Sequence, residues 1–170
     1  GEKTLGETEV LLRGERVVMA CTNKRIFLIK NTNSLLSKRR EVLHSIEVKD
    51  LLGWAHETPS LYLIMGGRQI TVLSMRARKP ENATEMLQCL QQGYIRGEHL
   101  LKFERTKDEF ILLTNKRIAK IHSSGGSEEI SLKNILGTEI KSSGLLSRSK
   151  LLLMGNMKEN TLEIDCADLA

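Results

Sequence analysis

The sequence predicts a mainly β fold: two copies of a small seven-stranded domain in tandem, with a C-terminal helix that only the first copy has. Three observations predict this. The pentapeptide Thr-Asn-Lys-Arg-Ile occurs at Thr22–Ile26 and again at Thr114–Ile118, and an identical repeat of this length is not expected by chance in a chain of 170 residues. Apolar and polar residues alternate through most of the chain, as in half-buried strands. One stretch near the middle has the period of a helix instead.

The repeat extends beyond the pentapeptide and indicates where the domains divide. Ser45–Gly53 aligns with Glu129–Gly137, and Leu61–Gly66 also has a counterpart in the second copy. The spacing between aligned blocks differs by a few residues, and insertions of that size are typical of surface loops. We therefore expect domain 1 to span residues 1–96 and domain 2 to span residues 97–170.

Seven strands are predicted in the first copy from alternation and β-branched content. They are Val10–Leu12, Arg16–Cys21, Arg25–Lys30, Val42–Val48, Leu52–Glu57, Leu61–Met65 and Gln69–Ser74. Thr22-Asn23-Lys24 is predicted to be a tight hairpin turn, because Asn tolerates the left-handed backbone that such turns need.

A helix of about residues 80–93 is predicted after the seventh strand. Pro80 suits a first helical turn. Ala83, Met86, Leu87 and Leu90 recur at i, i+3, i+4 and i+7, which places them on one apolar face.

The second copy repeats the strand pattern without the helix. Its predicted strands are His99–Glu104, Glu109–Thr114, Arg117–His122, Glu129–Leu132, Ile135–Lys141, Lys150–Met154 and Thr161–Cys166. The sequence stops at Ala167–Ala170, where the helix would begin. We therefore expect the chain to be part of a larger polypeptide.

The excess of positive charge lies entirely in the first copy. The whole chain carries a net charge of +5. Residues 1–96 hold 15 Lys and Arg against 10 Asp and Glu, whereas residues 97–170 hold 11 of each class. Attraction to an anionic partner is therefore expected of domain 1.

Cysteine usage and hydropathy predict a cytoplasmic protein. Cys21, Cys89 and Cys166 are odd in number and widely spaced, which suits a reducing compartment rather than a disulfide framework. No apolar run approaches the ~18–20 residues that span a bilayer.

The strand pattern resembles a known superfold. Seven strands closed by one helix, with the Thr-Asn-Lys-Arg-Ile hairpin followed by an Ile-x-x-x-(Asp/Asn)-(Leu/Ile)-Leu-Gly segment, are similar to the pleckstrin homology (PH)-like families, including GRAM and bacterial PH-like domains. The resemblance covers nearly the whole chain, once per copy, and implies two seven-stranded PH-like barrels in tandem. The chain departs from the family at Trp54, because PH domains usually carry a Trp in the helix and this Trp lies in a predicted strand.

The resemblance also implies a lipid site at one open end of the first barrel. There, the loops after strands 1, 3 and 6 would gather around a phosphoinositide headgroup or another anionic lipid. Cations in these loops would neutralise phosphates, and two leucines beside them suit a loop that touches a bilayer. The expected lipid-binding residues are Arg13, Arg16, Leu35, Leu36, Lys38, Arg39, Arg40 and Arg68. The alternative is a solvated loop with locally packed leucines.

Other cations are secondary candidates. They are Lys24, Arg25, Lys116, Arg117, Arg148 and Lys150. For the first four, which belong to the repeated turn, the structural interpretation is favoured: the same hairpin must close twice, and an Arg that opens a strand can pair across it. In the second copy, acids offset the bases of the corresponding loops.

Catalytic, metal and cofactor chemistry is not predicted. His44, His56, His99 and His122 are scattered, and none has a Cys or carboxylate at ligand or triad spacing. Few aromatic residues are present, so a base-stacking surface for nucleic acid is not expected.

The sequence therefore predicts a non-enzymatic adaptor module at the cytoplasmic membrane surface. Domain 1 would bind phosphoinositide or other anionic lipid, and domain 2 would be structural or protein-binding. The alternative is a protein-interaction scaffold without lipid affinity, in which a sheet edge or the helix groove takes a peptide. A histone-binding module is a third possibility, although the positive net charge is a poor match for a basic partner.

Overall fold

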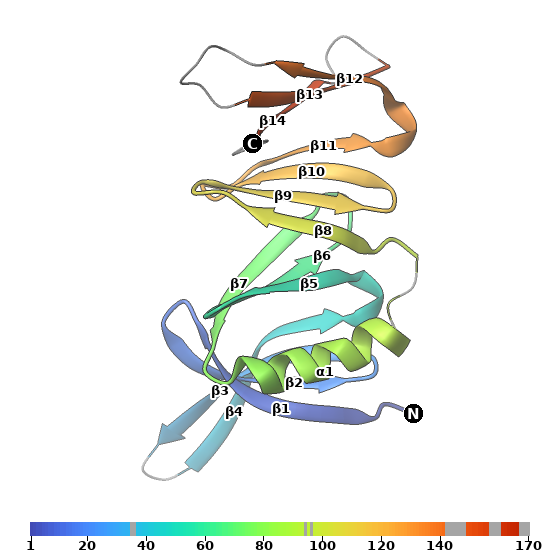
Figure 1. The fold of residues 1–170 in the computed structure, drawn as a ribbon. Helices are drawn as coiled ribbons and strands as arrows, with labels where there is room; N and C mark the ends of the chain where they lie inside the picture. Colours follow the sequence, from blue (N-terminus) through green and yellow to red (C-terminus); the bar gives the residue numbers. More distant parts are fainter. Residues whose placement is uncertain (35–36, 94, 96, 142–148, 157–160, 167–170) are drawn as a thin grey trace. The chain divides into compact units, whose positions relative to one another are not determined.

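The computed structural model describes residues 1–34, 37–93, 95, 97–141, 149–156 and 161–166 (Figure 1). The chain divides into two compact units, Gly1–His99 and Leu100–Ala170. Each unit is described by itself.

Unit 1 contains one antiparallel sheet of seven strands. In sheet order the strands are β4-β3-β2-β1-β7-β6-β5. Their bounds are β1 Thr4–Leu12, β2 Glu15–Thr22, β3 Arg25–Ser34, β4 Ser37–Glu47, β5 Leu51–Glu57, β6 Ser60–Met65 and β7 Thr71–Ala77. The two halves of the sheet are joined by a short ladder between β1 and β7, in which Val10 pairs with Ala77 and Leu11 with Arg76.

The predicted PH-like barrel is wrong for unit 1, because its sheet is open. β4 and β5 are the two edges of the sheet, and no ladder joins them among the described strands. Closing a barrel requires such a ladder. Instead, the 3₁₀ turn η1 (Val48–Asp50) carries the chain from one edge strand to the other.

The helix α1 (Pro80–Gly93) packs against β1 and β5 and supplies much of the core (Figure 1). All four residues of its predicted apolar face are buried; these are Ala83, Met86, Leu87 and Leu90. They join inward-facing residues of the sheet in one cluster. The helix lies close to β1 at Gly6, where a Cβ atom would stand 2.7 Å from Met86 Sδ. Burying a leucine of this kind contributes roughly 1.5–3 kcal/mol.

Unit 2 contains two smaller antiparallel sheets, so its predicted barrel is also wrong. One sheet has the order β11-β10-β9-β8 and the other the order β12-β13-β14. The bounds are β8 Leu100–Arg105, β9 Glu109–Thr114, β10 Arg117–His122, β11 Ser127–Ser131, η2 Leu132–Asn134, β12 Ile135–Lys141, β13 Ser149–Gly155 and β14 Thr161–Cys166. A small apolar cluster that includes Ile130, Leu153 and Leu162 joins the two sheets. The expected loss of a final helix at 167–170 lies outside the described residues.

The described part of the chain has no helix that combines the length and hydrophobicity needed to cross a bilayer.

Candidate functional site

The basic segment predicted as a loop is the end of a long hairpin. β3 and β4 pair as far as Ser34 and Ser37, with one register shift between Leu28 and Ile29, so Lys38, Arg39 and Arg40 belong to β4. Their partners across the ladder are Asn33, Thr32 and Asn31, in that order. The predicted strands were too short here, because the residues on both arms are polar and lack the alternation of apolar and polar residues that predicts a strand. Leu35 and Leu36 lie outside the described residues.

The two arginines of the basic segment Lys38–Arg40 are exposed and only weakly compensated. Arg39 and Arg40 are both exposed. Arg40 Nη1 lies 3.7 Å from Glu7 Oε1, and both side chains remain largely accessible to solvent. An exposed pair of this kind contributes about 0–1 kcal/mol. Among the described residues, Arg39 has no ion-pair partner. Both cations are therefore available to an external anion.

The turn between β1 and β2 lies beside β4. Arg13 and Gly14 both have positive φ angles, 50° and 85°, which is the backbone of a two-residue hairpin turn. Arg13 lines a cavity of about 420 Å³ together with Leu43 and His44 of β4. Arg16 follows in β2 and is exposed. The structure therefore places Arg13 near the strand that carries the basic segment.

Arg68 does not join this group. It belongs to the turn between β6 and β7, and Figure 1 shows that turn at the opposite end of unit 1 from the β3–β4 hairpin. The expectation that all six cations gather at one mouth depended on a closed barrel. In the open sheet, the turn between β6 and β7 lies away from the β3–β4 hairpin.

The repeated turn has the same internal hydrogen bonds in both units. The Thr22 hydroxyl oxygen accepts hydrogen bonds from the backbone N–H groups of Lys24 and Arg25, at 3.2 and 2.8 Å. Thr114 accepts the equivalent bonds from residues 116 and 117, at 3.1 and 3.0 Å. The repeat therefore encodes a turn that closes itself through the Thr side chain.

The arginine of each repeated turn is also engaged within the protein. Arg25 donates two hydrogen bonds to the Glu2 carboxylate. Arg117 Nη1 lies 2.7 Å from Glu129 Oε2, with both side chains mostly buried. Among the remaining secondary candidates, Lys150 pairs with Glu163, and Arg148 lies outside the described residues.

A charged cluster that the sequence pattern did not reveal lies in unit 2. Counted from the shared pentapeptide, Glu109 and Lys120 correspond to Val17 and Leu28, which are buried core residues of unit 1. Lys120 Nζ lies 3.9 Å from Glu109 Oε1, and the side chains are only 12% and 21% exposed. Unit 2 has therefore exchanged part of its apolar core for charge.

Two further residues complete this cluster. Glu128 Oε1 lies 3.5 Å from Lys120 Nζ. The two ring nitrogens of His122 lie 3.1 Å from Glu109 and 3.2 Å from Glu128. The four side chains come from three adjacent strands, so no single stretch of the sequence contains the cluster. Within the described residues, no group of three or more His, Cys, Asp or Glu side chains is arranged to hold a metal ion.

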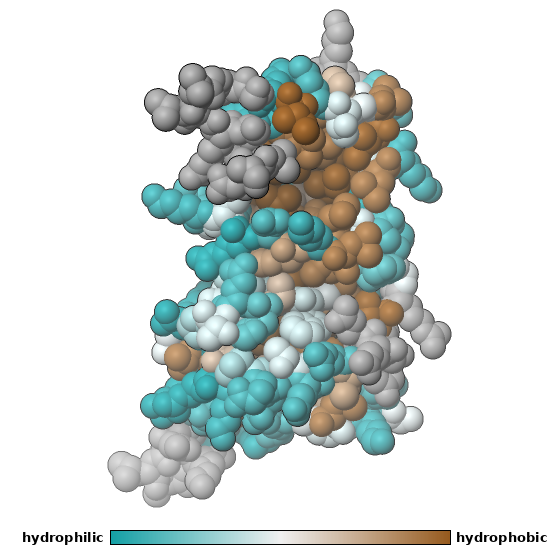
Figure 2. Space-filling model, in the orientation of Figure 1, coloured by the Kyte–Doolittle hydropathy of each residue, from teal (hydrophilic) through white to brown (hydrophobic). Residues whose placement is uncertain are grey.

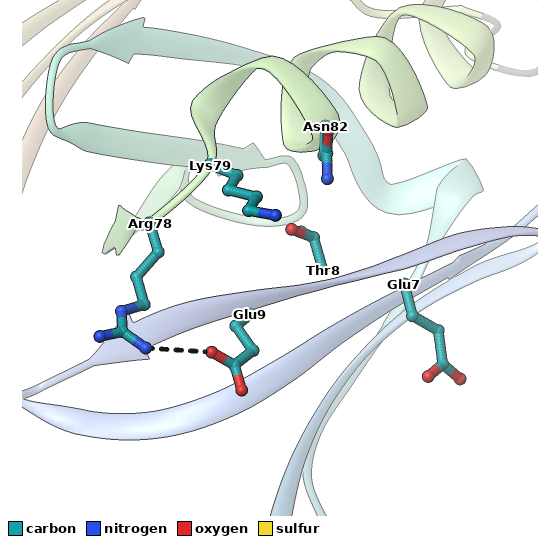
Figure 3. Close-up of a pocket in the computed structure, with 6 residues that line it drawn as sticks. All are labelled: Glu7, Thr8, Glu9, Arg78, Lys79 and Asn82. Atoms are coloured by element: carbon teal, nitrogen blue, oxygen red, sulfur yellow. Dashed lines mark hydrogen bonds and ion pairs between the residues drawn. The ribbon is translucent and has the colours of Figure 1, made fainter.

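A pocket of about 440 Å³ lies between β1 and the start of α1 (Figure 3). We call it the α1 pocket; the residues that line it are Glu7, Thr8, Glu9, Arg78, Lys79 and Asn82. The sequence does not reveal this pocket, because the residues that line it come from separate elements. The pair of cations directly before Pro80 was the available signal.

The two units differ in the hydropathy of their surfaces. On the face shown in Figure 2, unit 1 is mostly hydrophilic, whereas hydrophobic side chains gather over unit 2. Leu136 and Ile140 of β12 are 74% and 60% exposed. β12 is also an edge strand of its sheet.

Comparison of the sequence with protein-family models and with curated proteins finds no match.

Proposed function

We propose that the chain is a non-enzymatic module that binds anionic membrane lipids, phosphoinositides among them, through the β3–β4 hairpin of unit 1. The observation that carries the proposal is the placement of Lys38, Arg39 and Arg40 in sequence on one arm of a hairpin that projects from unit 1 (Figure 1). Each cation near an anionic membrane surface contributes about 1 kcal/mol of attraction. Three together contribute roughly 3 kcal/mol, which corresponds to about 100-fold in affinity.

The surroundings of the hairpin support this function. The residues that face the basic segment across the ladder are uncharged, so the opposite arm carries no acid that would neutralise it. Two leucines, Leu35 and Leu36, stand next to the cations in the sequence. Apolar residues adjacent to cations suit contact with the boundary between headgroups and acyl chains. Unit 2, with balanced charge, would serve as a structural or protein-binding partner.

Co-sedimentation with vesicles tests the proposal. The whole chain is mixed with phosphatidylcholine vesicles, with or without phosphatidylserine or a phosphoinositide. The triple variant Lys38→Ala, Arg39→Ala, Arg40→Ala should bind the anionic vesicles about 100-fold more weakly than the wild type.

The matched control removes three exposed lysines of unit 2: Lys102→Ala, Lys107→Ala and Lys133→Ala. Both triple variants lower the net charge from +5 to +2. The control should retain most of the wild-type binding. No binding by the wild type, or equal losses in the two triple variants, would refute the hairpin as the lipid site.

A protein-binding function is the second candidate, and β12 favours it. An edge strand with exposed Leu136 and Ile140 can take an extended peptide by strand addition. Selection from a displayed peptide library should then enrich sequences with alternating apolar residues, and Leu136→Asp with Ile140→Asp should abolish their binding. The same double variant should leave vesicle binding unchanged if lipid is the ligand of unit 1.

A further inference from the structure

The α1 pocket has the features of a site for a phosphate group. It lies at the positive end of a helix of 14 residues. The carbonyl of Lys79 accepts the first helical hydrogen bond, from Ala83 N at 3.5 Å. Pro80 has no N–H group, and the backbone N–H groups of Glu81 and Asn82 have no partner among the described residues. Free amides at a helix N-terminus, with a partial charge of about +0.5, favour anions.

The hydroxyl group of a nearly buried threonine points into the same space. Thr8 of β1 is only 8% exposed, and Figure 3 shows its hydroxyl directed toward the end of the Lys79 side chain. Within the described residues this hydroxyl makes no hydrogen bond. A ligand oxygen placed between Thr8 and Lys79 can accept a hydrogen bond from each of them.

The two carboxylates that line the pocket are both paired with arginines, and Glu81 of the first helical turn is not a lining residue. Glu9 Oε2 is paired with Arg78 Nη1 at 3.3 Å, and Glu7 is paired with Arg40. In Figure 3 both carboxylates point away from Lys79. Lys79 itself has no ion-pair partner in the described part of the chain. The donors that face the interior of the pocket are therefore an ammonium group, a hydroxyl group and the Asn82 amide.

We propose that the α1 pocket binds a phosphate group through Lys79, Thr8, Asn82 and the first free amides of α1. A volume of about 440 Å³ leaves room for more than the phosphate itself, so the group can belong to a small phosphorylated molecule or to a lipid headgroup. This site uses other donors than the basic arm of the β3–β4 hairpin, to which its rim is joined by the Glu7–Arg40 pair, and it does not depend on lipid binding there.

Titration of the whole chain with inorganic phosphate, followed by amide NMR, tests the proposal. The N–H signals of Glu81 and Asn82 should shift saturably at millimolar phosphate. Lys79→Gln should weaken binding about 10-fold, because it removes the charged donor. Thr8→Val keeps the shape of the side chain and should weaken binding about 5-fold with an unchanged melting temperature. Lys133→Gln, with the same change of charge in unit 2, should have no effect.

Two further experiments are needed. One distinguishes a soluble phosphate ester from a lipid headgroup as the ligand, and the other distinguishes this site from the lipid site on the β3–β4 hairpin. If a soluble phosphate ester is the ligand, glycerol 3-phosphate should bind the same residues more tightly than inorganic phosphate does. If only phosphoinositide vesicles bind more tightly than inorganic phosphate, the ligand is a lipid headgroup. Lys38→Ala with Arg39→Ala should weaken hairpin-dependent vesicle binding about 25-fold and leave phosphate binding intact. The proposal is overturned if the amide shifts do not saturate, or if Lys79→Gln and Thr8→Val both bind phosphate as the wild type does.

Discussion

Arg40 of β4 lies 3.7 Å from Glu7 of β1, and this ion pair connects the basic hairpin to the rim of the α1 pocket. The two candidate anion sites of unit 1 are thus neighbours that share a carboxylate. Because both partners are exposed, the pair is weak and can open when a stronger anion approaches Arg40.

Removing this carboxylate should strengthen vesicle binding. Glu7→Gln releases Arg40 and should raise the affinity for anionic vesicles about 3-fold, within the range of one exposed ion pair. Glu57→Gln changes the net charge equally at an exposed position of β5 and serves as the control. Equal gains in both variants would indicate a general charge effect and count against a role for the Glu7–Arg40 pair.

Acid should destabilise unit 1 through Glu2. Hydrogen bonds from Arg25 and Thr22 lower the pKa of the Glu2 carboxyl from 4.5 to about 2. A carboxyl with a lowered pKa stabilises the fold above its unfolded-state pKa and loses that contribution as the pH falls toward the folded-state value. Wild type should therefore be more stable than Glu2→Gln above pH 4.5, and the difference should shrink to nothing near pH 2. Urea unfolding at a series of pH values measures it; a constant difference would contradict this assignment.

The charged cluster of unit 2 should be replaceable by the apolar pair found in unit 1. Lys120→Leu alone leaves Glu109 without its ammonium partner and should lower the free energy of unfolding by about 1–3 kcal/mol. Adding Glu109→Val restores the residue types of unit 1, so the double variant should be as stable as the wild type or more stable. Chemical denaturation of the four proteins in this cycle measures the coupling. Additive losses would show that the two side chains act independently.

The two cysteines with described side chains should react at different rates. Burial raises the pKa of the Cys21 thiol to about 12, whereas Cys89 of α1 is exposed. Because the thiolate is the reactive form, iodoacetamide should label Cys89 in the native protein and leave Cys21 unlabelled until the protein is denatured. Peptide mass mapping distinguishes the two sites. Equal labelling of Cys21 under native conditions would show that the core of unit 1 opens readily.

Local elements were predictable from the sequence, but the closure of the sheet was not. The alternation of β2 and the apolar face of α1 are local patterns, and both are present in the structure. Whether β4 pairs with β5 depends on the path of Val48–Asp50, and the spacing of apolar residues in the sequence does not predict that path. The predicted barrels were inferred by resemblance rather than from the residues, and they failed at this step.

Only the part of the candidate sites that is contiguous in the sequence was predicted, because contacts between distant segments leave no local pattern. Lys38–Arg40 is contiguous, so its charge is visible in the sequence. The α1 pocket joins Thr8 to Lys79, two residues that only the packing of α1 on β1 brings together. Arg68 was expected at the site because a closed barrel would place it there. In the open sheet it lies elsewhere.

The most direct test of the account is the affinity for anionic vesicles as the hairpin loses its cations one at a time. Arg39→Ala, then Arg39→Ala with Arg40→Ala, then the triple variant with Lys38→Ala should each weaken binding about 5-fold relative to the preceding protein. Phosphatidylcholine vesicles should bind none of them. Affinity that stays level across the series, or that falls equally for the neutral vesicles, would contradict the assignment of lipid binding to the β3–β4 hairpin.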